Sequence, residues 1–242
     1  SRPIILVNEG CAMSSHTTYH TFKLLQLHKY DVDFLKTEPY TPEKNPYYTD
    51  GMSILNMLHL TVKKHKNLVF KLPINFLLKK EIHNMLVSEE ARICIIQREN
   101  LLDITTCFVR DFLQESESQT NKTFGEWRTS EERSNTLANE NLILDELARQ
   151  QKVVAHKTHF MNEFVKNQKS LISAEKLSEL CFSEHTMLFE ILGFTLDKNI
   201  FDSYIKQLPV KEKYNHSDVI HSEDLTLFKK KLDKMGCLHF WR

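Results

Sequence analysis

Short apolar runs alternate with amphipathic stretches through the first half of the chain. Runs rich in Ile, Val and Leu at residues 3–8, 67–71 and 92–97 predict buried strands, the second of them stopped by Pro73. Between these runs apolar residues recur at helical spacing, which predicts helices over residues 17–28, 52–64, 76–87 and 100–114. The alternation is typical of βαβ units with right-handed crossovers, which build an α/β fold around a parallel central sheet.

The second half of the chain has a mostly helical pattern. Helical spacing of apolar residues marks three segments, residues 137–147, 177–191 and 225–235. Gly193 and Gly236 follow the last two, as expected of helix ends. Val153–His156 is predicted as a short strand. The polar stretches 31–50 and 115–130 are predicted to be irregular, the second as an exposed loop or lid.

Composition narrows the classes of protein to consider. The 242 residues fit a single domain over residues 1–242, and the formal net charge of zero gives no support to nucleic-acid binding. No apolar run is long enough to cross a bilayer and no signal peptide is visible, so we expect a cytoplasmic protein without stable membrane insertion. The chain begins without methionine, which leaves a lost N-terminal anchor open. Five cysteines without a C-x-x-C pair predict reduced thiols.

The loop between the first strand and the first helix is a candidate anion site. Backbone N–H groups of such a loop converge, the helix dipole adds positive charge, and hydroxyls of Ser14, Ser15, Thr17 and Thr18 add donors. It is not a Walker loop, because Gly-Lys-Ser/Thr is absent. The alternative is that Ser and Thr act here only as helix N-caps.

Two further strand ends carry candidate cationic groups. Arg98 follows the third strand, where open α/β sheets place ligands, and Thr106 lies eight residues later, so that both could grip one phosphate. The alternative is a surface arginine paired with Glu99 or Asp103. Lys71 ends the second strand and could neutralise charge that develops on a leaving phosphate, or could simply extend its ammonium into solvent.

A late basic segment, Lys211–His216, precedes the last helix. It contains Lys213 and could close over a nucleotide. The alternative is an ordinary solvated loop.

Taken in order, these segments resemble the sulfotransferases that use 3′-phosphoadenosine-5′-phosphosulfate (PAPS). That family binds the 5′-phosphosulfate with Arg/Lys-Ser-Gly-Thr-Thr-aromatic after its first strand, where this chain has Ser14–Tyr19. It binds the 3′-phosphate with an Arg after a strand and a Ser eight residues later, similar to Arg98 and Thr106. Its Glu-x-Leu and Leu-Gly motifs are matched by Glu175–Leu177 and Ile191–Gly193.

The glycosaminoglycan branch of that family adds two similarities. Its Lys-Ser-Pro after the second strand is similar to Lys71–Pro73, and its basic loop ending in His before a terminal helix is similar to Lys211–His216. The resemblance covers residues 4 to about 235 and implies a P-loop-like three-layer sandwich. It also implies that PAPS is bound without a metal. The implied binding residues are Ser14, Ser15, His16, Thr17, Thr18, Tyr19, Arg98, Thr106 and Lys213.

The chain departs from the family pattern at positions that matter for catalysis. Ser14 and His16 replace the basic residue and the glycine of the first loop, and apolar residues and Pro73 stand where the family has its catalytic His or Glu. The resemblance assigns Lys71 to the charge on the bridging oxygen. The general base is sought among His16, Asp33, Glu38, Glu43 and His65. We take Lys71, His16 and Glu38 as the catalytic candidates.

The function implied is transfer of a sulfuryl group from PAPS to a hydroxyl or amine of a small-molecule or glycan acceptor. Two alternatives remain. One is a sulfotransferase-like module that binds the nucleotide without turnover. The other is a P-loop-like nucleotide kinase, against which the absent Gly-Lys-Ser/Thr counts.

Overall fold

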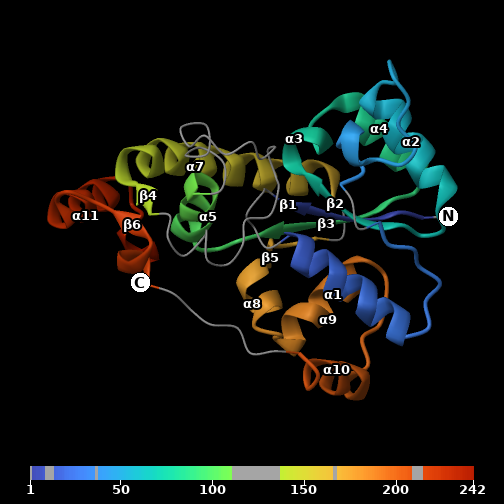
Figure 1. Cartoon of the computed structure of the whole chain (residues 1–242). Helices are drawn as coiled ribbons and strands as arrows, with labels where there is room; N and C mark the ends of the chain where they lie inside the picture. The colour runs from blue at the N-terminus through green and yellow to red at the C-terminus, as the bar shows by residue number, and fades with distance from the viewer. Residues whose placement is uncertain (1, 9–13, 36–37, 111–136, 166–167, 209–214) are drawn as a thin grey trace. The chain divides into compact units, whose positions relative to one another are not determined.

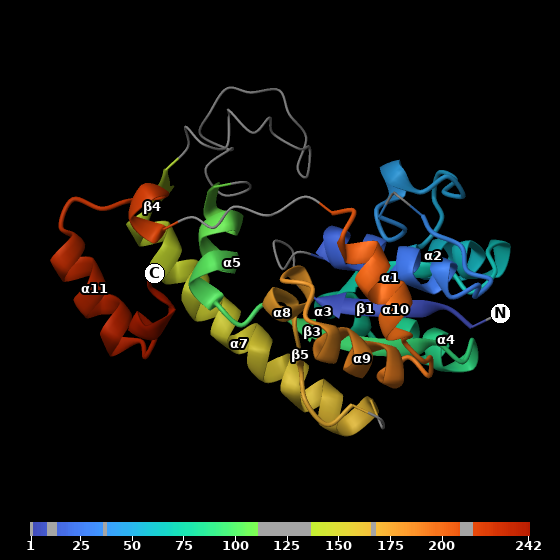
Figure 2. The same cartoon turned by 90° about the horizontal axis from the view of Figure 1, so that it is seen from below.

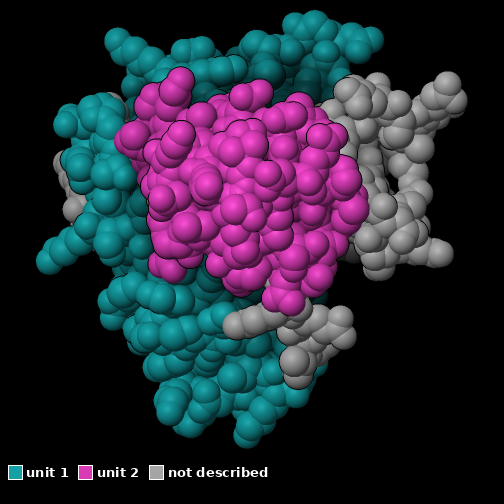
Figure 3. Space-filling model, turned by 90° about the vertical axis from the view of Figure 1, so that its left-hand side faces the viewer, with its two compact units in different colours: residues 1–97, 157–209 teal, residues 98–156, 210–242 magenta. Residues whose placement is uncertain are grey.

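The computed structural model describes residues 2–8, 14–35, 38–110, 137–165, 168–208 and 215–242 (Figure 1). The chain divides into two compact units, coloured in Figure 3. Unit 1 comprises residues 1–97 and 157–209, and unit 2 comprises residues 98–156 and 210–242. Each unit is described by itself, and the single domain expected over residues 1–242 stays a prediction.

Unit 1 is built on a four-stranded parallel sheet, which confirms the predicted α/β fold with a parallel central sheet. Its strands are β1 (Ile4–Asn8), β2 (Val69–Pro73), β3 (Arg92–Gln97) and β5 (Ile172–Ser173). They lie in the order β2-β1-β3-β5. In the register of the sheet, Leu6 of β1 lies opposite Lys71 of β2 on one side and Cys94 of β3 on the other.

Helices cover both faces of this sheet (Figures 1 and 2). One face carries α1 (Ser14–Leu27), α8 (Ala174–Ser178), α9 (Phe182–Ile191) and α10 (Lys198–Ile205). The other face carries α2 (Ile54–Lys64), α3 (Ile74–Leu77) and α4 (Lys80–Ser88). The end of α7 (Glu140–Phe164) packs beside α4, where the rings of His83 and Phe160 lie 5.5 Å apart.

The core beneath α1 explains why β1 is apolar along almost its whole length. Side chains alternate along a strand, so Ile4 and Leu6 point to the face covered by α1, where they join a buried cluster with Leu24 and Leu25 of that helix. Their neighbours Ile5 and Val7 are also fully buried. A strand buried on both faces must be a continuous apolar run, as the sequence pattern predicted.

Unit 2 contains α5 (Leu101–Phe108), the first part of α7, and α11 (Leu225–Lys234). A short parallel pair joins β4 (Ala138–Asn139) to β6 (Ile220–His221). These two-residue strands were not predicted, because a pair so short leaves no periodic signal in a sequence. The predicted loop or lid at residues 115–130 lies outside the described residues.

Several predicted elements need correction. Val153–His156 is not a strand but part of the 25-residue helix α7, because two consecutive valines are too few to override the helical pattern on either side. The helix predicted over 76–87 is two helices, α3 and α4. The helix predicted over 177–191 is also divided, and Leu180 lies between its halves with a φ of 58°.

The described cysteines and helices add two findings. Cys94, Cys107, Cys181 and Cys237 are free thiols, and Cys11 lies outside the described residues. Within the described part of the chain, no helix has both the length and the apolar character needed to cross a membrane.

The segment 31–50 lacks long elements, as predicted, but one buried side chain organises it. The Asn45 amide donates to the Pro39 carbonyl at 2.6 Å and to the Thr61 hydroxyl of α2 at 2.9 Å. Its oxygen accepts the backbone N–H of Tyr47 at 2.8 Å. Asn45 is only 6% exposed, so it attaches this segment to α2 without competition from water.

We expect Asn45→Ala to destabilise the folded chain by about 2–3 kcal/mol, because three buried hydrogen bonds are lost and their partners are left unsatisfied. Urea denaturation followed by circular dichroism measures the change. The matched control is Asn56→Ala on the exposed side of α2, which should stay within about 0.5 kcal/mol of the wild type. Equal midpoints for the two variants would contradict the role given to Asn45.

Candidate functional site

The strand order of unit 1 places a candidate site at the carboxyl end of β1. The chain passes from β1 to β2 on one side and then returns past β1 to β3 on the other. Ligands of open parallel sheets bind at the carboxyl ends of strands where the order reverses in this way. The loop that leaves β1 at this point, residues 9–13, lies outside the described residues.

Asn8 is a buried polar residue at this carboxyl end that the sequence analysis did not single out. It points to the same face as Ile4 and Leu6, the face covered by α1, and is 2% exposed. Within the described residues its amide nitrogen has no hydrogen-bond partner. A buried donor left unsatisfied costs about 1–3 kcal/mol, so Asn8 favours a ligand or loop atom that accepts its hydrogen bond. The only signal in the sequence is a polar residue that ends an apolar strand.

Helix α1 begins where the sequence analysis placed its anion site. The backbone N–H groups of its first turn, from Ser14 to Thr17, have no partner within the helix. Thr17 and Thr18 are buried, at 5% and 2% exposure. Tyr19 is 42% exposed and packs edge-on against Phe34. The predicted threonines thus lie inside unit 1, whereas the predicted tyrosine ring lies on its surface.

His16 is joined to a chain of polar groups that the sequence analysis missed. Its Nε2 lies 3.2 Å from Nε2 of His20, one helical turn further along α1. The other ring nitrogen of His20, Nδ1, is hydrogen-bonded to the Tyr204 hydroxyl of α10. Burial, with a smaller effect of Tyr19, raises the pKa of Tyr204 to about 12, so this hydroxyl keeps its proton at neutral pH. The four-residue spacing of two histidines was the available signal.

Lys71 and Glu38, both catalytic candidates, form an ion pair in which Lys71 Nζ lies 2.8 Å from Glu38 Oε1. Lys71 lies opposite Leu6, so its side chain leaves the sheet on the α1 face, diagonal to Asn8. Burial opposes ionisation of Glu38, but the hydrogen bond and charge of Lys71, together with Lys44, outweigh burial and lower the pKa of Glu38. Glu38 is therefore ionised at neutral pH and is a weak base.

The remaining candidates for the general base lie elsewhere. Asp33 accepts the backbone N–H of Lys66 and its own carbonyl accepts from Val69, which places it at the amino end of β2. His65 lies beside it, with Nδ1 at 3.3 Å from the Asp33 carboxylate. Glu43 is exposed on a single 3₁₀ turn. Of the five predicted candidates, His16 and Glu38 lie nearest in the fold to the carboxyl end of β1.

In unit 2, Arg98 pairs with Asp103, the alternative that the sequence analysis left open. Arg98 Nη2 lies 3.4 Å from Asp103 Oδ2. The pair is buried rather than on the surface, since Asp103 is fully buried and Arg98 is 9% exposed. Thr106 is also fully buried, and its hydroxyl donates to the Leu102 carbonyl at 2.6 Å within α5.

Asp103 binds two further groups from the C-terminal part of the chain. His216 Nε2 donates to Asp103 Oδ1 at 2.8 Å, and the Arg242 guanidinium pairs with Oδ2. The backbone N–H of Arg242 donates to His216 Nδ1, which makes His216 a neutral imidazole with its proton on Nε2. Burial acts to raise the pKa of Asp103, but the His216 hydrogen bond and the two arginines outweigh it and lower that pKa.

Asp103 is thus shared by two guanidinium groups and an imidazole, and among them the Arg242 side chain is 40% exposed. His216 also anchors the end of the predicted basic loop to the residue that holds Arg98. Lys213 of that loop lies outside the described residues.

No protein-family model, no curated protein and no solved structure matches this chain. Among the described residues, no group of three or more His, Cys, Asp or Glu side chains could hold a metal ion.

We expect the pKa of Glu38 to lie below its ordinary value near 4.5 and to rise in Lys71→Met. Burial raises this pKa, and in the variant only Lys44 is left to offset the effect of burial. Carboxyl ¹³C NMR titration measures both values. Since folding depresses this pKa, the pair stabilises the folded chain above the unfolded pKa, and this contribution is lost as pH falls through the folded pKa.

The matched control is Lys63→Met, which removes a lysine at the same 2.8 Å from a different carboxylate, Glu89. It should raise the pKa of Glu89 and leave that of Glu38 unchanged. A Glu38 pKa insensitive to Lys71→Met would contradict the ion pair.

Proposed function

We propose that this chain is a PAPS-dependent sulfotransferase of P-loop-like fold that acts on a hydroxyl or amine of a small-molecule or glycan acceptor. The observation that carries the proposal is the set of groups on the α1 face at the carboxyl end of β1. A buried amide donor, a lysine with its counter-ion and the N-terminus of α1 gather there. Such donors suit the phosphosulfate end of PAPS.

In the proposed site, the first-turn N–H groups of α1 and the hydroxyls of Thr17 and Thr18 bind the 5′-phosphate and the sulfuryl oxygens. Asn8 donates its side-chain N–H to the same group. Lys71 lies where it stabilises the charge that develops on the bridging oxygen, and Glu38 holds the lysine in place. These groups would lower the activation barrier by electrostatic stabilisation of the transition state. Donors that are already fixed in place before the reaction stabilise it most effectively.

The proposed general base is His16. Glu38 is a weaker candidate because its pKa is lowered, whereas an imidazole has a pKa suited to accepting a proton near pH 7. His20 and Tyr204 would orient the His16 ring. As the acceptor oxygen or nitrogen forms its bond to sulfur, the bond from sulfur to the bridging oxygen breaks, and the acceptor proton passes to His16. The bisphosphate leaves with the bridging electron pair.

For the other end of the nucleotide, the proposal assigns Arg98 and Thr106, with Lys213 from the basic loop. The guanidinium groups of Arg98 and Arg242 beside Asp103 support an anion near Arg98. Thr106 uses its hydroxyl hydrogen within α5, so it would contribute to a phosphate only by turning away from the Leu102 carbonyl.

A module that binds the nucleotide without turnover is the second candidate. Two observations favour it: the lowered pKa of Glu38 and the engagement of His16 with His20. Tight binding of 3′-phosphoadenosine-5′-phosphate with no release of this product from PAPS, over a panel of phenol, amine and sugar acceptors, would distinguish it from an enzyme.

We expect the bisphosphate 3′-phosphoadenosine-5′-phosphate to raise the melting temperature by about 5–10 °C at a hundred times its dissociation constant, which corresponds to about 2.7 kcal/mol. AMP, which lacks the 3′-phosphate, should bind at least tenfold more weakly. Arg98→Ala should remove most of that preference. Differential scanning fluorimetry with the bisphosphate, AMP and ATP measures the order of the three melting-temperature shifts.

Arg149→Ala is the control, since Arg149 belongs to the same unit and pairs with Glu146. It should keep the wild-type preference for the bisphosphate. A larger shift with ATP than with the bisphosphate would favour a nucleotide kinase. No shift with any of the three would overturn the nucleotide assignment.

We expect Lys71→Met to lower kcat for release of the bisphosphate from PAPS by about 10²–10³-fold, because a group that stabilises transition-state charge is removed. Bisphosphate affinity should change less than threefold. His16→Gln should lower kcat by about 10²-fold or more and remove the acidic limb of the pH–rate profile. Lys63→Met, the matched lysine of α2, should keep wild-type kcat, and a kcat unaffected by either site variant would refute the assigned roles.

A further inference from the structure

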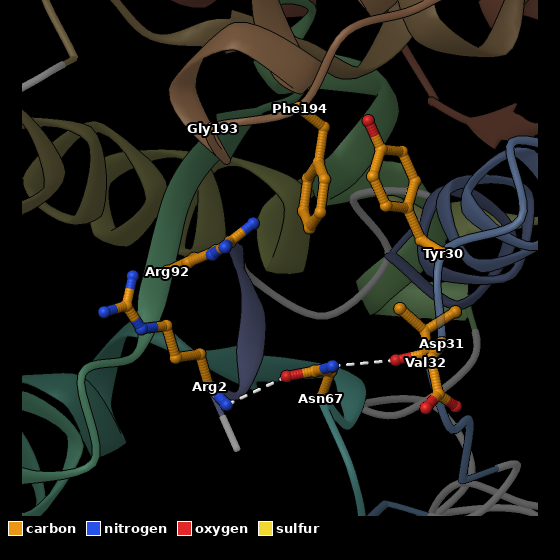
Figure 4. Close-up of a pocket in the computed structure, with 8 residues that line it drawn as sticks. All are labelled: Arg2, Tyr30, Asp31, Val32, Asn67, Arg92, Gly193 and Phe194. Atoms are coloured by element: carbon orange, nitrogen blue, oxygen red, sulfur yellow. Dashed lines mark hydrogen bonds between the residues drawn. The ribbon is translucent and has the colours of Figure 1, made fainter.

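A cavity lies in unit 1 at the amino ends of the strands, away from the carboxyl end of β1. Its volume is about 270 Å³ (Figure 4). Cavities for drug-sized ligands usually measure about 300–1,000 Å³, so this one suits a smaller molecule, about the size of one substituted ring. Figure 4 shows two arginines on one side of the cavity and Tyr30 with Val32 on the other.

The register of the sheet explains why the two arginines share one side. Arg92 of β3 lies opposite Ile4 of β1, and Arg2 precedes Ile4 by two residues, so both side chains leave the sheet on the same face. Arg2 pairs with Glu90 at 2.7 Å. Arg92 forms no ion pair within the described chain. Burial, and then repulsion by Arg2, lower the pKa of Arg92.

The remaining wall combines the Tyr30 and Phe194 rings and Val32 with Asn67 and Asp31, whose carboxylate pairs with Lys66. The Tyr30 and Phe194 rings pack with their centroids 4.6 Å apart, and the Arg92 guanidinium lies 4.2 Å from the Phe194 ring centre. Gly193, with a φ of 74°, turns the chain after α9 and brings Phe194 to this position. Arg92 also donates to the Leu192 carbonyl at 3.0 Å, which fixes the guanidinium before any ligand arrives.

We propose that this cavity binds a small aromatic carboxylate. Its anionic group faces Arg92 and Arg2, where a planar carboxylate matches the guanidinium fork. Its ring contacts the edge of the Tyr30–Phe194 pair and Val32. The backbone N–H of Arg2 donates to Asn67 at 3.0 Å, so the cationic side of the cavity is held just before the start of β1 as well as at the start of β3.

The contacts of Arg92 with Leu192 and Phe194 would also stabilise α9 in a protein that binds nothing here. A purely structural arginine contributes to the melting temperature of the unliganded chain and selects no ligand. The test must therefore compare ligands as well as variants.

The experiment titrates the full chain with benzoate, benzyl alcohol and inorganic phosphate, and follows ¹H–¹⁵N chemical shifts of the backbone. We expect benzoate to shift the amides of Gly193, Phe194 and Asn67, and to bind at least tenfold more tightly than benzyl alcohol or phosphate. Arg92→Gln should weaken benzoate at least tenfold. Arg149→Gln, a matched arginine of unit 2, should leave it unchanged.

Arg2→Gln is a second variant, at an exposed position, and it should weaken benzoate binding about threefold. Equal affinities for benzoate and benzyl alcohol would show that the arginines do not bind the carboxylate. Equal affinities for benzoate and phosphate would show that the Tyr30 and Phe194 rings do not bind the ligand ring. Shifts that cluster away from the cavity, or benzoate affinity unchanged in both arginine variants, would overturn the proposal.

Discussion

Strand β1 lies between β2 and β3 and is covered by helices on both faces, and this double burial governs the rest of unit 1. Every side chain from Ile4 to Val7 is fully buried, so polar chemistry has no place along the strand. The first polar side chain of β1 is Asn8, at its carboxyl end. Polar groups from β2 and α1 gather near the same end because the crossover connections return the chain there. The topology of a parallel sheet is thus enough to separate the hydrophobic core along β1 from the candidate site at its carboxyl end.

The ion pair of Lys71 and Glu38 follows from the same constraint. Lys71 lies in the edge strand β2 on a face covered by α1, and it needs a counter-charge because it is removed from most of the surrounding water. Glu38 supplies it, and the irregular segment that carries Glu38 is fixed to α2 by Asn45. Once Glu38 serves this purpose its pKa is lowered, so it is poorly suited to remove a proton. The two roles proposed for carboxylates near this site, counter-ion and base, exclude one another for a single residue.

The sequence predicted the parts of the fold that local pattern determines. The apolar runs of β1 and β3 and the helical spacing of α1 and α11 were sufficient to place those elements. Val153–His156 was assigned wrongly because a short β-branched run was judged apart from the long helix around it. The network of Asp103 with His216 and Arg242 was beyond prediction, since its contacts join residues 113 and 139 positions apart. Asn8 was missed because a single polar residue after a strand has many ordinary explanations.

The network around Asp103 is not the most stable way to fill a buried site. Apolar residues of similar volume often stabilise a fold as well as a buried ion pair does, or better, since charges lose their hydration on burial. A carboxylate between two guanidinium groups fixes the orientation of both groups. His216 in turn holds the carboxylate, because its Nε2–H donates to the other carboxylate oxygen. Two guanidinium groups held at one carboxylate present cationic donors of fixed orientation, which is what a phosphate binds. In the proposed function, that orientation, rather than the stability of the network, links Arg98 to the phosphate of a nucleotide.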